Sequence, residues 1–169
     1  MAVYAAVAAT PSLSLDRAMS ELSRAADHSK LSIAAAGLLA LGGGRRGRRA
    51  AKAGLASVAV TSAVVNQVVK RLGPRGRPDR EASEVPFARH VPMPTTSSFP
   101  SGHSAAAFAF ATGVGHTLPH AAVPLRALAA VVAYSRVHTG VHYPGDVVVG
   151  ALIGAALAQA TARVIERRA

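Results

Sequence analysis

The chain has 169 residues, 50% of them hydrophobic, and a formal net charge of +11 from 19 Lys and Arg against 8 Asp and Glu. This length gives room for a single domain over residues 1–169, and the mean hydropathy of +0.29 is higher than that of most soluble domains. The excess of cations favours anionic partners such as phosphates and acidic lipid headgroups. The absence of cysteine excludes disulfides, thiolate metal sites and a cysteine nucleophile.

The N-terminal segment, residues 1–30, is predicted to contain an amphipathic helix. Its start lacks the basic residues that precede the apolar stretch of a secretory signal, so we take it as part of the mature protein. Over residues 13–27, apolar side chains recur at helical spacing with charged residues between them. Such a helix would lie against a bundle or in the membrane interface.

Five stretches rich in Ala, Val, Leu and Gly follow. They cover residues 31–44, 53–69, 104–118, 121–135 and 147–162. A helix of about 16 residues spans roughly 24 Å, which is short for a hydrocarbon core of about 30 Å. Taken singly, these lengths also fit the buried helices of a soluble bundle. Their repetition leaves too little amphipathic helix to cover a soluble core, so the sequence predicts an all-α integral membrane bundle of about five transmembrane helices.

Two polar segments separate these stretches. Residues 71–100 concentrate Pro, Gly, Ser, Thr and charged residues and are predicted to form a long polar loop. The run RRGRR at 45–49 lies between two apolar stretches without aromatic neighbours, which argues against a nucleic-acid site. We expect it to form a cytoplasmic loop that contacts acidic lipid.

Three short motifs carry the chemistry, and they lie between residues 70 and 146. They are K-x6-RP beginning at Lys70, PSGH at 100–103, and SR-x5-H-x3-D ending at Asp146. Catalysis of phosphoryl transfer depends on fixed donors that hold the charged oxygens of the phosphate. The motifs supply such donors as cations, and the PSGH sequence opens an apolar helix whose free N–H groups favour an anion.

The two histidines in these motifs, His103 and His142, can take two different catalytic roles. One can attack phosphorus while the other protonates the departing alkoxide. Asp146 stands four residues after His142 and can hold one ring nitrogen so that the other faces the phosphate. His103 then takes the role of the acid.

The three motifs together resemble the type 2 phosphatidic acid phosphatase (PAP2) superfamily, which also includes membrane glucose-6-phosphatases and soluble vanadium haloperoxidases. All defining positions are present and in the family's order. The resemblance implies that His142 is the nucleophile, Asp146 its partner and His103 the general acid. It implies phosphate binding by Lys70, Arg77, Ser101, Gly102 and Arg136. It implies neither a metal nor a cofactor. Six helices are usual in the membrane branch, against five and an amphipathic segment here.

The implied function is hydrolysis of a lipid phosphate or diphosphate, such as phosphatidate, a polyprenyl phosphate or a prenyl-linked sugar phosphate. Two alternatives stay open: transfer of the phosphoryl group to another acceptor, and a non-catalytic protein that binds lipid phosphates. The expected partners are the substrate and membrane lipids, not nucleic acid. His138 and His142 have the spacing of a metal pair, but Gly140 and Pro144 interrupt a helix there and no third ligand is evident.

Alternating passage of the five stretches places all three motifs on one face of the membrane. The other face receives a set of cations, namely Arg45, Arg46, Arg48, Arg49, Lys52, Arg163, Arg167 and Arg168. By the positive-inside rule this second face is cytoplasmic, so the site faces outward. Together with an Ala- and Arg-rich composition, this predicts an integral protein of a bacterial cell membrane with its active site on the non-cytoplasmic face.

Overall fold

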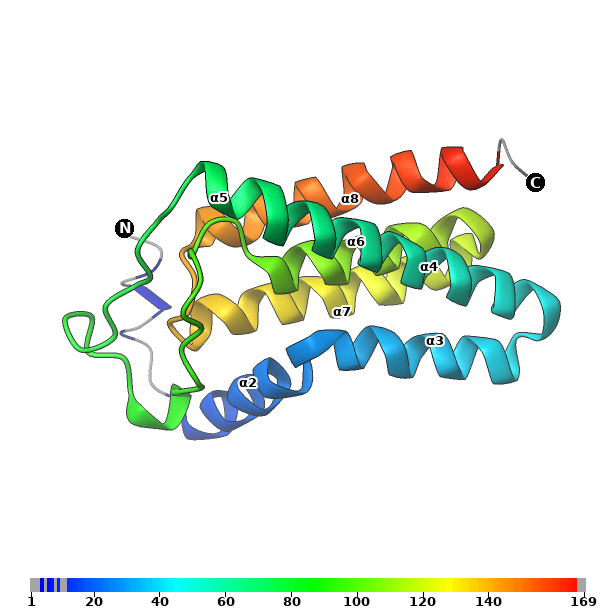
Figure 1. Ribbon diagram of the computed structural model, residues 1–169. Helices are drawn as coiled ribbons and strands as arrows, with labels where there is room; N and C mark the ends of the chain where they lie inside the picture. Colours follow the sequence, from blue (N-terminus) through cyan, green and yellow to red (C-terminus); the bar gives the residue numbers. More distant parts are fainter. Residues whose placement is uncertain (1–3, 5, 8, 10–11, 167–169) are drawn as a thin grey trace.

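The computed structural model describes residues 4, 6–7, 9 and 12–166, which form α-helices joined by turns and one long loop (Figure 1). The helices are α2 (Leu13–Ala25), α3 (Lys30–Gly42), α4 (Gly44–Val64), α5 (Lys70–Leu72), α6 (Gly102–Thr117), α7 (Pro119–His138) and α8 (Pro144–Glu166). Short turns add η1 (Asp27–Ser29), the π-helical η2 (Val65–Val69) and η3 (Phe87–Arg89). No strand occurs in the described residues, so the all-α prediction is confirmed.

Each predicted apolar stretch corresponds to a helix of the bundle, and α2 corresponds to the predicted amphipathic segment. α4, η2 and α5 run on as one helix of 29 residues, Gly44–Leu72. Among the described residues, this helix and Pro144–Ile165 are long and apolar enough to cross a membrane. α3 has only 13 residues, so the prediction of about five spans remains a prediction.

The structure corrects the expectation of a loop at residues 45–49. α4 begins at Gly44, so the RRGRR run forms the first turns of a helix. Gly43 permits the tight turn from α3, because a Cβ on it would lie 2.7 Å from the carbonyl oxygen of Leu39. The four arginines are therefore exposed on the first turns of this helix.

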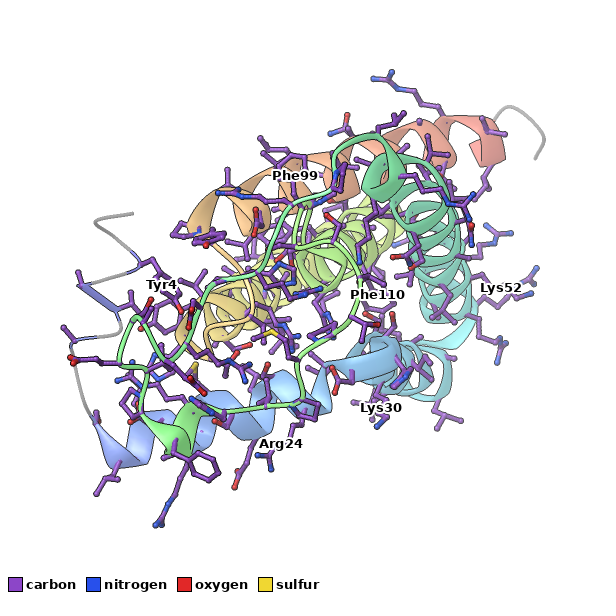
Figure 2. All side chains as sticks on the ribbon, turned by 60° about the vertical axis from the view of Figure 1, so that its left-hand side comes forward. Tyr4, Arg24, Lys30, Lys52, Phe99 and Phe110 are labelled. Atoms are coloured by element: carbon purple, nitrogen blue, oxygen red, sulfur yellow. The ribbon has the colours of Figure 1, made fainter. Side chains whose placement is uncertain are left out.

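The central helix is α6, which packs against α4, α7 and α8 (Figure 1). Its sequence of Ala and Gly lets neighbouring backbones come close. Figure 2 shows Phe110 among the helices, where it is 3% exposed. On α8, a Cβ at Gly150 would lie 2.5 Å from the Ser101 carbonyl oxygen, and one at Gly154 would lie 2.1 Å from that of Ala105. These two glycines therefore pack within the bundle.

All three motifs lie at one end of the bundle. α5, the long loop, the start of α6, the end of α7 and the start of α8 meet there, while the α3–α4 and α6–α7 turns lie at the other end (Figure 1). The predicted alternation of the helices is therefore confirmed.

α2 is tied to the same end by a buried cluster of charges. The carboxylate of Asp16 accepts a hydrogen bond from Arg89 Nε at 2.7 Å and lies 2.8 Å from His138 Nε2. The cluster joins α2 to the long loop and to α7. It also gives His138 a partner on α2 rather than a place beside His142.

We predict that Gly154→Val destabilises the fold, because the new side chain collides with the α6 backbone. Overpacking of this kind costs about 1–3 kcal/mol, which should lower the thermal unfolding midpoint measured by circular dichroism in detergent.

The matched control is Gly37→Ala on α3, where an added Cβ meets nothing within 4 Å. Alanine is the better helix former, so this variant should unfold at or above the wild-type temperature. Equal midpoints for the two variants would contradict a close α6–α8 contact.

Candidate active site

A cavity of about 310 Å³ opens at the motif end of the bundle. Its lining includes Asn66, Lys70, Arg77, Gly102, His103 and His142 together with the apolar residues Leu31, Val65, Ala106, Ala107 and Val132. Charged and apolar groups thus meet in one hollow, as a ligand with a phosphate and a lipid tail requires.

His142 lies in the turn between α7 and α8. Gly140 adopts a left-handed φ of 66°, which lets the chain reverse so that the His142 amide donates to the Arg136 carbonyl at 3.1 Å. The ring lies between a cation and a carboxylate: Nε2 is 3.4 Å from Arg77 Nη1, and Nδ1 is 3.6 Å from Asp146 Oδ2. The second separation is longer than a hydrogen bond.

The same surroundings keep the His142 ring neutral. Burial lowers the pKa of His142 to about 4; the carboxylate of Asp146 opposes this shift, whereas Arg77 and Arg136 add to it. At neutral pH the ring therefore carries a lone pair. With the proton on Nδ1, toward Asp146, that lone pair is on Nε2 beside the guanidinium.

Asp146 is fully buried at the start of α8, where the helix dipole favours a carboxylate. One oxygen accepts from Arg75 Nη1 at 2.7 Å, and the other accepts from the hydroxyl of Ser98 and from the Tyr143 amide at 2.9 Å. These donors fix the carboxylate next to His142. Arg75 and Ser98 could not be predicted from the sequence, because both lie in a loop without periodicity.

Arg77 is held by the loop rather than left free. Its guanidinium donates to the carbonyl oxygens of Thr96, Ser97 and Val141, at 3.1, 3.3 and 2.8 Å. These three hydrogen bonds to backbone carbonyls give a long side chain one orientation, with Nη1 facing His142.

Lys70 reaches the cavity from the end of the 44–72 helix. The π-helical turn η2 precedes it, and π turns of this type are frequent at functional sites. Lys70 Nζ donates to Thr96 Oγ1 at 3.2 Å. A Cβ at Gly102 would lie 3.8 Å from this Nζ and 3.9 Å from Asn66 Oδ1, so both groups lie over the start of α6.

Of the PSGH residues, Ser101 supports the start of α6, whereas Gly102 and His103 line the cavity. Ser101 is buried and caps α6, since its hydroxyl accepts from the Ser104 amide at 3.4 Å. Its own amide donates to the Asp146 carbonyl at 2.9 Å, which ties α6 to α8. Gly102 and His103 line the cavity, and His103 Nε2 lies 2.8 Å from Asp27 Oδ1.

Arg136 is buried behind the cavity wall. Its Nη1 donates to the hydroxyl and the carbonyl of Ser23 and lies 3.8 Å from Asp27 Oδ1. Its Nε has no hydrogen-bond partner in the described part of the chain.

The structure therefore gathers all eight predicted site residues at one place, but in two layers. Five line the cavity, namely Lys70, Arg77, Gly102, His103 and His142. Ser101, Arg136 and Asp146 lie behind them. Within residues 4, 6–7, 9 and 12–166, no group of three or more His, Cys, Asp or Glu is placed to hold a metal ion.

Asp27 also lies at the site, but it stands outside the three motifs and could not be predicted from them. One signal in the sequence is the small number of acidic residues. The chain has 8 Asp and Glu against 19 Lys and Arg, so each carboxylate is a candidate partner for a site of buried cations.

Three phosphatases are similar to this chain in sequence. A decaprenylphosphoryl-5-phosphoribose phosphatase of Mycobacterium tuberculosis is 42% identical over 129 residues, which cover 74% of this chain and 65% of the relative. The chain thus matches about two thirds of that protein's length. A protein of the same name from Mycolicibacterium smegmatis is 38% identical over 89% of this chain and 78% of the relative. A lipid A 1-phosphatase of Rhizobium johnstonii is 35% identical over 64% of this chain and 45% of the relative.

Two solved structures superimpose on the bundle. LpxE of Aquifex aeolicus aligns with a TM-score of 0.76 and 26% identity, over 95% of this chain and 93% of that one. A transmembrane PAP2 type phosphatidylglycerolphosphate phosphatase from Bacillus subtilis aligns with a TM-score of 0.73, over 98% and 84% of the two chains. Because the two sequences are only 24% identical, this similarity concerns the fold alone. A sequence model of the PAP2 superfamily matches residues 50–169, so the chain belongs to the PAP2 superfamily.

Proposed function

We propose that the chain is a metal-independent membrane phosphatase that hydrolyses a lipid phosphate or diphosphate through a phosphohistidine. The observation that carries the proposal is the position of His142 on the cavity wall, with Nε2 beside Arg77 and Nδ1 toward Asp146. A neutral imidazole oriented by a carboxylate and facing fixed cations is equipped to attack phosphorus.

In the first step, His142 Nε2 forms a bond to phosphorus while the bond from phosphorus to the ester oxygen breaks. The electron pair of that bond goes to the oxygen, which takes a proton from His103 and leaves as an alcohol. Lys70 and Arg77 face the transferring oxygens from the cavity wall. Arg136 lies one layer behind this wall, so its proposed part in phosphate binding is electrostatic.

In the second step, water attacks the phosphohistidine. His103, which gave up its proton, now accepts one from the water as the new oxygen–phosphorus bond forms. The bond between Nε2 and phosphorus breaks, so inorganic phosphate leaves and both histidines return to their starting forms. Asp146 keeps Nδ1 as the protonated nitrogen in both steps.

The lipid class follows from the apolar wall and from the relatives. The cavity borders α3, α6 and α7 through Leu31, Ala107 and Val132, so an apolar tail can lie against the helices while the phosphate stays at the motif end. The names of the relatives specify lipid-linked sugar phosphates. We therefore propose a prenyl-linked sugar phosphate as the first substrate to test, followed by polyprenyl phosphates and phosphatidate.

The proposed orientation places this site on the non-cytoplasmic face of a bacterial cell membrane. The opposite end of the bundle carries the cations at the start of α4. Such an excess of Lys and Arg is typical of cytoplasmic ends.

We predict that the detergent-purified protein releases phosphate from these lipids in excess EDTA, and that His142→Ala reduces the release at least about 1,000-fold, because it removes the nucleophile. A panel of the three lipid classes with a colorimetric phosphate assay measures both effects. His120→Ala is the matched control, since His120 is exposed at the start of α7, at the other end of the bundle. Release that needs a metal, or that persists in His142→Ala, would refute the mechanism.

The orientation is testable because the chain has no cysteine. A cysteine at Ala82, exposed in the long loop, should react with a membrane-impermeant maleimide in intact bacterial cells. A cysteine at Gly42, where a Cβ has open space, should react only after permeabilisation. The reverse labelling pattern would place the site in the cytoplasm.

A further inference from the structure

Asp27 brings the N-terminal segment to the cavity. It lies in η1, between α2 and α3, with its side chain 36% exposed. The two residues after it, His28 and Ser29, have left-handed φ values of 56° and 58°, which are uncommon for side chains of this size. Such backbone conformations cluster at functional sites. Here the turn leads the chain along the cavity, whose lining includes Ala26, His28 and Ser29.

The carboxylate of Asp27 contacts two of the motif residues. His103 Nε2 lies 2.8 Å from Oδ1, and Arg136 Nη1 lies 3.8 Å from the same oxygen. Ser23, at the end of α2, accepts from the same Arg136 nitrogen. The α2–η1 segment therefore contacts both the proposed acid and a proposed phosphate ligand.

The contact between Asp27 and Nε2 leaves the other ring nitrogen of His103, Nδ1, to face the substrate. Nδ1 makes no hydrogen bond within the described residues, and the ring lines the cavity. Asp27 thus stands to His103 as Asp146 stands to His142: a carboxylate lies at one nitrogen and the other nitrogen is left for the phosphate ester.

A carboxylate in this place also matches what a general acid needs. The charged and titratable groups facing His103 include Arg136 and His142, with Lys70 and Arg77 across the cavity. The three cations among them, Arg136, Lys70 and Arg77, disfavour a further positive charge in the cavity. A carboxylate beside the ring stabilises the imidazolium and fixes its plane.

We propose that Asp27 is a positioning residue for the general acid: it holds His103 by Nε2 so that Nδ1 delivers the proton to the leaving oxygen. The role rests on the proposed phosphatase function. Asp27 lies outside residues 50–169, the part that the family model matches. The amphipathic N-terminal segment is then part of the active site and not only a membrane attachment.

The test compares two leaving groups. Phosphatidate releases an unactivated alkoxide that needs a proton, whereas 4-nitrophenyl phosphate releases a stable phenolate that does not. We expect Asp27→Asn to lower kcat for phosphatidate by about 10- to 100-fold, within the range of general acid catalysis, and to lower kcat for 4-nitrophenyl phosphate less than about threefold. His103→Ala should show the same split, and more strongly for phosphatidate.

Glu21→Gln is the matched control, because Glu21 is an exposed carboxylate on α2 and its loss should leave both rates at the wild-type values. Equal losses of Asp27→Asn on both substrates, with a lowered unfolding midpoint, would show a purely structural role and overturn the proposal, as would wild-type rates. If the wild-type protein releases no phosphate from any of these substrates or lipids, or if His142→Ala releases as much phosphate as the wild type, the proposed phosphatase function is wrong. The role of Asp27 is then wrong as well.

Discussion

The active-site end depends on one buried carboxylate, that of Asp146. Burying an ionised carboxylate costs free energy unless donors surround it. Here Arg75, Ser98 and the Tyr143 amide do so, and two of these donors come from the long loop. The loop is therefore drawn across the ends of the helices. Arg77 follows Arg75 by two residues, so the same attachment brings its guanidinium to His142. The loop has little regular structure, and these bonds give it a fixed path.

The helices around this carboxylate pack closely because the residues at their contacts are small. Gly150 of α8 lies against the Ser101 backbone, and the Ser101 amide bonds to the Asp146 carbonyl. The start of α6 and the start of α8 are thus fixed in relation to each other without any large side chain between them. In a membrane, where apolar side chains gain little by leaving lipid for protein, such close packing is a main source of helix association. The distances among His103, His142 and Asp146 depend on it.

Most of the fold could be predicted from the sequence, because apolar stretches specify helices and their alternation specifies which ends meet. The motifs predicted eight residues that the structure gathers at one end of the bundle, but not their arrangement in two layers: Arg136 was predicted to bind phosphate, yet its side chain lies behind the cavity. Residues 45–49 were expected in a loop, since charge density alone cannot reveal that a helix continues through it. Asp27, Arg75 and Ser98 were missed because their roles arise from tertiary contacts between segments distant in sequence, to which neither periodicity nor motif spacing is sensitive.

The contact between η1 and α6 also bears on how the molecule is made. Proteins are synthesised from the N-terminus, and early segments fold before later ones exist. Asp27 leaves the ribosome well before His103, and His142 with Asp146 comes last of all. Until α8 has been made, the nascent chain lacks Asp146, the carboxylate that anchors the loop and faces the His142 ring. We therefore expect that a stalled or truncated translation product lacking α8, and with it Asp146, does not hydrolyse the lipids around it.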